Sequence, residues 1–298
     1  MKERAISFGK TATLLGVLAE PTDRDAARTR PAVVLLNSGI LHRVGACRSY
    51  VRIARRLAES GVTALRFDFS GIGDSPARRD SLAFEESSVL EVREAMDYLQ
   101  RRRGFDRFVL VGLCSGADVG FETAVVDSRV VGLGQIDAYA YPTFKHQLVH
   151  YGPRMLRWSS WAGWIKRKAG IGSDAAVEED VSEEAAMPEY VRVFPPKDVV
   201  QEKLRILADR RVEQYYVYTG GQEEYNYEKQ FEDSHRAVDF RGTLQVDFLP
   251  EADHIITGLA DQRRLIRSVD AWCSSCWPAA DTDAATESSV PDARPVPA

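Results

Sequence analysis

The chain has 298 residues, of which 44% are hydrophobic and 28% charged. This length allows one large domain or two ordinary ones, and a chain of this size buries about 75% of its surface on folding, so the fold requires neither disulfide nor metal. The 39 Lys and Arg against 44 Asp and Glu give a net charge of −5, which argues against a nucleic-acid partner held mainly by phosphate contacts. Four scattered cysteines and no long apolar stretch predict a cytoplasmic protein without stable membrane insertion.

Strand-like and helical segments alternate along the chain. A hairpin is predicted first, from residues 6–8 and 11–18 around Gly9-Lys10. Short apolar runs then predict strands, and periodic patterns predict helices between them. This alternation is typical of an α/β fold with a mostly parallel sheet of about eight strands and helices on both faces. The strands are predicted at 32–36, 63–69, 108–112, 130–136, 215–218 and 244–249, and the helices at 50–59, 84–100, 117–126 and 259–272.

Two regions depart from this alternation. Residues 139–205 separate two core strands and are rich in aromatic and then acidic residues, so we expect a helical cap inserted into a single domain of residues 1–273. Trp158 and Trp161 in this cap either pack on the core, line an acyl pocket or touch a membrane surface. Residues 274–298 are rich in Pro, Ala, Asp and Ser, which predicts a disordered tail.

The segment around Cys114 is the most informative one. An apolar strand ends at Gly112 and a helix begins near Ser115, and the Gly-x-Cys-x-Gly between them matches a nucleophile elbow, a tight turn that exposes its central side chain. The adjoining helix N-terminus favours an anion and therefore the thiolate. Taken alone, the motif also fits a buried structural cysteine. Ser115 as the centre would put Leu113 at a position that needs a small residue.

Three other motifs stand in a fixed order around this segment. Residues 37–40 (Asn-Ser-Gly-Ile) follow the first core strand, residues 68–75 form a D-x-x-G-x-G-x-S turn, and His254 comes directly after the last strand. With these motifs the chain resembles the α/β-hydrolase superfamily over nearly all of its length except the tail. Within it the chain is similar to serine-aminopeptidase-like (S33-type) hydrolases, including bacterial ones found with the exosortase A system. The residues that carry this finer resemblance are Asn37, Gly39, His42, Arg43 and Gly45.

The resemblance implies a role for each catalytic candidate. Most members have serine at the elbow, and dienelactone hydrolase is the precedent for cysteine, so Cys114 would be the nucleophile and His254 the general base. The acid usually follows the strand after the cap, where Glu223 and Glu224 stand behind two glycines. Asp137 is a third candidate, because some members carry the acid after the preceding strand.

The remaining motifs bear on the oxyanion and on cofactors. The backbone N–H of Ser115 and that of Gly39 or Ile40 are the expected oxyanion donors. The glycine-containing turn at 68–75 lacks the third glycine and following helix of a dinucleotide site, so neither a cofactor nor a metal is expected. Cys273 and Cys276 have redox-motif spacing without a redox-motif context, which we interpret as incidental.

These features predict a hydrolase that cleaves ester or thioester bonds of a small-molecule or carrier-bound acyl substrate through an acyl-cysteine intermediate. A thioester intermediate is also attacked by amines, thiols and hydroxyls, so an acyltransferase is the first alternative. The second alternative is a catalytically inactive protein that keeps the fold and binds a ligand under the cap.

Overall fold

The computed structural model describes residues 1–10, 13–147, 149 and 192–279. The strands are β1 (Lys2–Phe8), β2 (Leu14–Glu20), β3 (Ala32–Leu36), β4 (Ala64–Phe67), β5 (Phe108–Leu113), β6 (Val130–Ile136), β7 (Glu213–Thr219) and β8 (Leu244–Leu249). The helices are α1 (Arg24–Ala27), η1 (Ala46–Arg48), α2 (Ser49–Glu59), α3 (Phe84–Arg103), α4 (Ser115–Val126), α7 (Lys197–Asp209), α8 (Gln230–Ser234) and α9 (Leu259–Cys276).

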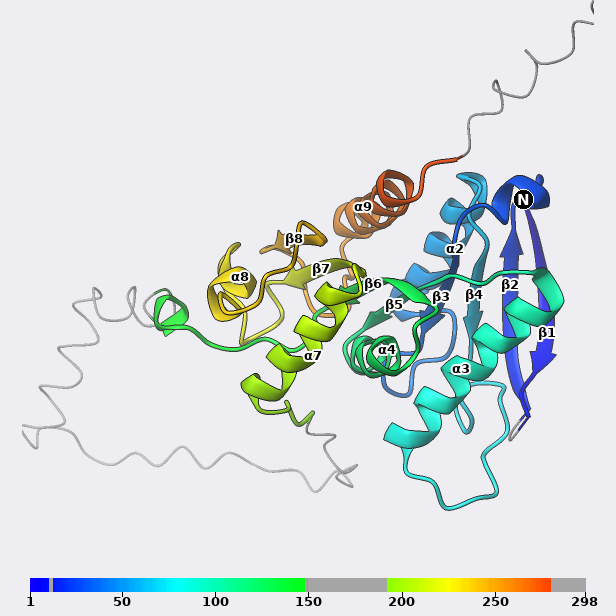
Figure 1. The fold of residues 1–298 in the computed structure, drawn as a ribbon, viewed down its shortest axis with the longest axis horizontal. Coiled ribbons are helices and arrows are strands. Elements are labelled where there is room, and N and C mark those ends of the chain that lie inside the picture. The colour runs from blue at the N-terminus through cyan, green and yellow to red at the C-terminus, as the bar shows by residue number, and fades with distance from the viewer. Residues whose placement is uncertain (11–12, 148, 150–191, 280–298) are drawn as a thin grey trace, which may run out of the picture.

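All eight strands form one sheet in the order β1-β2-β4-β3-β5-β6-β7-β8 (Figure 1). Strand β2 is antiparallel to both of its neighbours, β1 and β4, and every other pair is parallel. The sheet is therefore the mostly parallel one that the alternation of strands and helices predicts. The carboxyl ends of its parallel strands meet at one edge, which is where open α/β sheets bind ligands.

Helices cover both faces of this sheet. Helices α3, α4, α7 and α8 contribute to one hydrophobic cluster, and α2 and α9 contribute to the other (Figure 1). Strand β3 shows the reason, because Val34 and Leu36 belong to the first cluster whereas Val33 and Leu35 belong to the second. Successive side chains of a strand point to opposite faces, so an uninterrupted apolar run is buried on both sides.

The predicted cap falls largely on residues 150–191, which lie outside the described residues together with Trp158 and Trp161. The last part of that predicted range, from residue 197, is the beginning of α7. Its Val200 and Leu204 are buried in the first cluster, so this part is the helix that connects β6 to β7 across the sheet. The predicted tail begins too early, because residues 274–276 are the last turn of α9, and residues 280–298 lie outside the described part. Within the described residues, no helix has the length and apolar character needed to cross a membrane.

Candidate active site

Cys114 lies between β5 and α4 in a backbone conformation that few residues adopt. Its φ is 53° and its ψ is −121°, and its N–H donates to the carbonyl of Ile136 at 2.9 Å. Strain of this kind costs about 1–3 kcal/mol and persists where the surroundings enforce it. A Cβ at Gly112 would collide with the backbone of Gly116, and one at Gly116 would collide with the carbonyl of Asn37. The two glycines therefore allow β5, α4 and the loop after β3 to approach closely enough to form the elbow.

Asp137 supplies the carboxylate that contacts His254. It follows β6 directly, has a φ of 47° and is 0% exposed. Its Oδ2 accepts a hydrogen bond from Nδ1 of His254 at 2.8 Å, and the N–H and hydroxyl of Thr219 donate to its two oxygens at 2.8 and 2.7 Å. A carboxylate held in this way fixes the tautomer and orientation of the imidazole and stabilises the imidazolium.

Cys114 and His254 interact electrostatically, and each favours the charged form of the other. Burial raises the pKa of the Cys114 thiol, but the hydrogen bond to His254 and the charge of Arg192 act in the opposite direction and hold the net pKa below its usual value. The hydrogen bonds to Asp137 and to Cys114 raise the pKa of His254 to about 10 against the effect of burial. The arrangement favours a thiolate beside an imidazolium, which is the reactive form of a cysteine nucleophile.

The structure does not bring Glu223 or Glu224 to His254, which corrects the order of preference among the three acid candidates. The side chain of Glu224 accepts from the amide of Gln222 at 3.0 Å, and the carbonyl of Glu223 accepts from the ring of His146 at 3.1 Å.

Gly220 and Gly221, which precede these glutamates, allow close packing of two loops. A Cβ at Gly220 would collide with the carbonyl of Pro250, and one at Gly221 would collide with the backbone N of His254. The turn after β7 thus makes room for the backbone of the loop that carries His254, and the acid comes from the end of the neighbouring strand β6.

The predicted oxyanion donors lie beside the elbow. The N–H of Gly39 donates to the hydroxyl of Ser115 at 2.7 Å, and the backbone of Ser115 contributes to lowering the pKa of Cys114. The Ile40 residue is 83% exposed. An oxyanion can therefore accept a hydrogen bond from the Gly39 N–H in one of two ways. It replaces the Ser115 hydroxyl as the acceptor, or both oxygens accept from the same N–H.

A buried carboxylate holds the loop that carries Gly39. Asp68 is 0% exposed and accepts from the backbone N–H groups of Arg43 at 2.5 Å and of Asp74 at 3.1 Å. The guanidinium of Arg43 also pairs with it, and the amide of Asn37 donates to it at 3.4 Å. Asp68 therefore fixes the loop after β3 against the loop after β4, which agrees with the structural role that its motif predicts.

Arg192 is a site residue that no sequence motif indicates. Its guanidinium donates to the carbonyl of Asp137 at 2.8 Å and to that of Cys114 at 3.4 Å, and it pairs with the carboxylate of Asp118 on α4. It also lies over the ring of Tyr139, 5.2 Å from the ring centroid. One positive charge thus contacts the backbone of both Cys114 and Asp137. The only available signal was an arginine at the end of the predicted cap, far from Cys114 in the sequence.

A hollow of about 320 Å³ opens beside the elbow. It is bounded by α3 and α4 on one side and by the residues around Arg192 on the other. Its walls combine apolar groups with three carboxylates, of which that of Asp118 is paired with Arg192 and that of Glu122 with Lys203. The lining residues are Phe84, Glu85, Val89, Ser115, Asp118, Val119, Glu122, Tyr139, Arg192 and Val193.

An eight-stranded sheet of this order, with the elbow after β5 and a histidine after β8, defines the α/β-hydrolase fold, and solved structures agree. XC6422 from Xanthomonas campestris, described as an a/b serine hydrolase without lid, matches with a TM-score of 0.56 and 16% identity over 93% of this chain and 96% of its own. Mouse alpha/beta hydrolase domain-containing protein 10 matches with a TM-score of 0.53 and 16% identity over 93% and 100%. The Pyrococcus furiosus esterase Pf2001 matches with 0.55 and 12% over 93% of each chain. These likenesses establish the fold.

Sequence comparisons are more limited. The chain is 27% identical over 144 residues to the uncharacterized protein YcjY of Escherichia coli (strain K12), and this match spans 46% of each protein, less than half of that relative's length. No family model matches the chain.

Proposed function

We propose that the protein is a hydrolase that cleaves ester or thioester bonds of a small-molecule or carrier-bound acyl substrate, with Cys114 as the nucleophile. The proposal rests chiefly on the chain of contacts from Asp137 through His254 to Cys114 at the carboxyl edge of the sheet. It also draws on the elbow conformation of Cys114 and on the adjacent hollow. The resemblance to S33-type hydrolases stays a prediction.

The first half of the reaction forms an acyl-enzyme. The Cys114 thiolate attacks the carbonyl carbon of the substrate, and the N–H of Ser115 and the N–H of Gly39 stabilise the oxyanion. His254, held through Nδ1 by Asp137, gives its other ring proton to the departing alkoxide or thiolate as the C–O or C–S bond breaks. The product is an acyl thioester on Cys114 and a neutral His254.

The second half of the reaction releases the acyl group. Neutral His254 removes a proton from water while the water oxygen attacks the thioester carbonyl. Collapse of the tetrahedral intermediate breaks the bond to sulfur, releases a carboxylic acid and restores the thiolate and imidazolium pair. An amine or alcohol in place of water would give acyl transfer by the same steps.

Intact-mass measurement of the acyl-enzyme tests this function. The full chain is incubated with p-nitrophenyl esters and acyl thioesters of several chain lengths, with and without an acceptor amine or alcohol. We expect one acyl adduct on Cys114 that clears in water, and neither adduct nor turnover in Cys114→Ala. The control Cys47→Ala, which removes an exposed cysteine, should behave as the wild type.

Two other outcomes would contradict hydrolysis. An adduct that clears only when acceptor is added would identify an acyltransferase. The absence of both adduct and turnover across the panel, with Cys114→Ala indistinguishable from the wild type, would favour a non-catalytic ligand-binding protein.

A further inference from the structure

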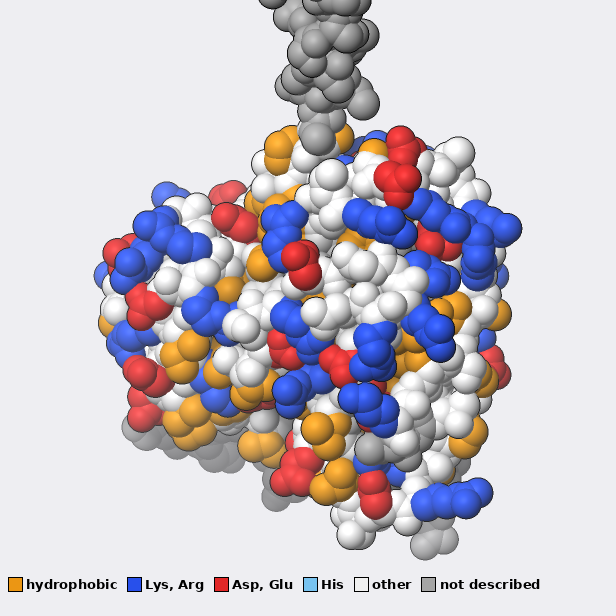
Figure 2. All heavy atoms as spheres, turned by 45° about the vertical axis from the view of Figure 1, so that its right-hand side comes forward, with side chains coloured by type: hydrophobic (Ala, Val, Ile, Leu, Met, Phe, Trp, Pro, Cys, Tyr) orange, Lys and Arg blue, Asp and Glu red, His pale blue; other side chains and the backbone are white. Residues whose placement is uncertain are grey.

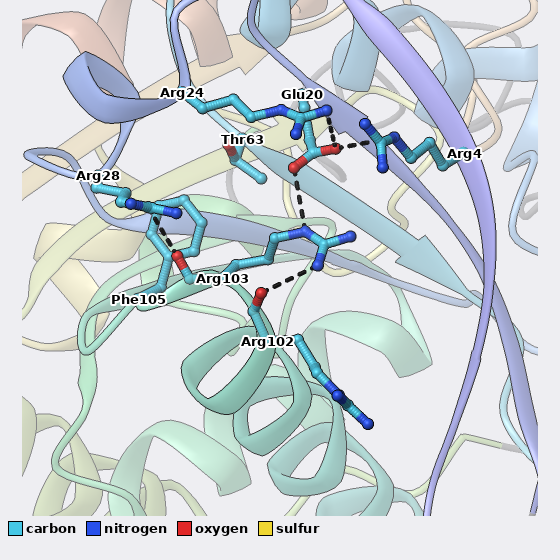
Figure 3. Close-up of a pocket in the computed structure, with 8 residues that line it drawn as sticks. All are labelled: Arg4, Glu20, Arg24, Arg28, Thr63, Arg102, Arg103 and Phe105. Atoms are coloured by element: carbon cyan, nitrogen blue, oxygen red, sulfur yellow. Dashed lines mark hydrogen bonds and ion pairs between the residues drawn. The ribbon is translucent and has the colours of Figure 1, made fainter.

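Five arginines line a small pocket far from Cys114. Three of them, Arg4 of β1, Arg24 of α1 and Arg103 of α3, reach the carboxylate of Glu20 at the end of β2 (Figure 3). Arg28, which follows α1, bonds the carbonyl of Arg103 instead, and the side chain of Arg102 points away from Glu20. Lys and Arg side chains are also numerous on the face of the molecule that carries β1 and β2 (Figure 2). The pocket has a volume of about 140 Å³. Its lining consists of Arg4, Glu20, Arg24, Arg28, Thr63, Arg102, Arg103 and Phe105.

Glu20 orders the guanidinium groups around it. Its side chain is 3% exposed, and its two oxygens lie 3.1 Å from Nε of Arg103, 3.2 Å from a terminal nitrogen of Arg24 and 3.5 Å from Nε of Arg4. One carboxylate thus holds three cations in fixed positions. It cannot neutralise them, so these three arginines and Glu20 keep a formal charge of +2, whereas Arg28 is paired with Asp25 and the whole chain carries −5.

The arginines keep most of their hydrogen-bonding capacity. A guanidinium has five N–H donors. Arg28 bonds the carbonyl of Arg103 and the carboxylate of Asp25 through two nitrogens, and Arg103 bonds Glu20 and the carbonyl of Arg102 through two nitrogens, which leaves one nitrogen of each guanidinium outside these bonds. Nε of Arg4 is buried and finds no hydrogen-bond partner among the described residues. The bonds from Arg28 and Arg103 to carbonyl groups at the end of α3 therefore account for only some of the donors in the cluster.

The spare donors match a phosphate group. Planar guanidinium forks bind phosphate oxygens through paired, charge-assisted hydrogen bonds, which is why arginine is favoured over lysine where such an anion is held. A water molecule occupies about 30 Å³ in the liquid, so a pocket of about 140 Å³ accommodates a group of a few heavy atoms. The hydroxyl of Thr63 and the ring of Phe105 complete the walls (Figure 3).

The pocket lies at the opposite edge of the sheet from the elbow. Thr63 comes directly before β4 and Phe105 shortly before β5, whereas Cys114 follows the other end of β5. Six residues of strand span about 20 Å, so a ligand held by the arginines does not reach the sulfur. We propose that this arginine pocket binds a phosphate group of a soluble small molecule, at a site separate from the triad.

Isothermal titration calorimetry of the full chain tests the proposal. Inorganic phosphate and pyrophosphate are titrated in chloride buffer at constant ionic strength, which separates specific binding from screening. We expect saturable binding by the wild type and a loss of tenfold or more in affinity for both Arg24→Gln and Arg28→Gln. Arg24→Lys keeps the charge without the fork and should be intermediate.

The matched control is Arg101→Gln, which removes an arginine of α3 that pairs with Asp97 and does not line the pocket. Its affinity should equal that of the wild type. No saturable binding by the wild type, or equal affinity in Arg24→Gln, Arg28→Gln and the wild type, would overturn the proposal. Binding to phosphatidylcholine vesicles that contain phosphatidic acid, without binding of either soluble anion, would overturn it in favour of a membrane surface.

Discussion

At the scale of single residues, the reactivity of Cys114 depends on groups that lie far from it in the sequence. Asp137 orients His254, and His254 and Arg192 together lower the pKa of the thiol. The helix N-terminus at Ser115 adds one backbone donor. A cysteine at a strand-to-helix turn is therefore activated here mainly by tertiary contacts.

The exchange of Asp137 for Asn distinguishes the acid candidates. Asn can hold the imidazole in the wrong tautomer and cannot stabilise its cation, so we expect the rate of Cys114 acylation to fall by about 10²–10⁴-fold. Glu223→Gln and Glu224→Gln should acylate at the wild-type rate, because neither carboxylate contacts His254. Stopped-flow detection of p-nitrophenol release measures all three. A larger loss of acylation rate in Glu224→Gln than in Asp137→Asn would identify Glu224, in the turn after β7, as the acid.

The pH dependence of Cys114 alkylation measures the thiolate directly. A free cysteine thiol has a pKa of about 8.5, and the pKa of Cys114 is lowered. Alkylation of Cys114 by iodoacetamide should therefore continue below about pH 8.5 and decline as the pH falls through the lowered pKa. His254→Gln and Arg192→Gln should each move the midpoint upward. Peptide mass mapping follows the site, with the Cys47 peptide as the internal reference. A midpoint that neither variant moves would contradict the role assigned to both cations.

Sequence alone could identify part of this site. The glycines around Cys114 and the position of His254 after the last strand are local signals, because each concerns one turn beside one strand. Which carboxylate contacts the imidazole depends on which strand end lies close to it in the fold. Asp137 does so from a left-handed backbone conformation, which no local sequence pattern predicts. Arg192 contacts Cys114 only through the folding of the chain between them.

At the scale of elements, buried strands were predicted better than short helices. Residues 32–36 and 130–136 were predicted with the bounds of β3 and β6, because continuous apolar runs reflect burial on both faces. Residues 244–249 also match the bounds of β8, although this edge strand is only partly buried. Strand β4 is shorter than the predicted 63–69, since Asp68 already turns away to hold the loop of Gly39. Helix α7 was missed because its apolar positions fall at the end of a region dominated by aromatic and acidic residues, which suggested a cap.

The turn after β7 offers a test of close packing. In Gly221→Ala the new methyl group would collide with the backbone of His254, and overpacking of this kind costs about 1–3 kcal/mol. We expect a lower free energy of unfolding by urea titration and slower acylation of Cys114. Gly242→Ala, whose Cβ would meet open space at a φ of +81°, should cost stability without slowing acylation. Equal acylation rates in both variants would show that the turn does not position the histidine.

At the scale of the whole molecule, the central strands join the two hydrophobic clusters. In β5, Leu110 packs in one cluster and Val109 and Val111 in the other, whereas the edge strand β8 is only half-buried. The sheet therefore forms part of both cores, and the candidate active site lies at the carboxyl end of the fully buried strand β5.

Truncations in these two strands should have different effects on the stability of the molecule. Leu110→Ala removes a fully buried side chain and should lower the free energy of unfolding by about 2–5 kcal/mol, with an unchanged urea m-value. Val246→Ala in β8 should cost less, because Val246 is only partly buried. Urea titration followed by circular dichroism compares them. Similar losses in both would indicate that the edge strand contributes as much to the core as the centre.

On the proposed function, the order of Cys114, Asp137 and His254 along the chain also sets the time at which the thiol gains its partners. Cys114 and Asp137 lie on strands β5 and β6, but His254 follows β8, the last strand to leave the ribosome. A growing chain that has completed the elbow still lacks the imidazole, which is one of the groups that lower the pKa of Cys114. On the proposed function, the thiol therefore reaches its full reactivity only after the loop that follows β8 has been made.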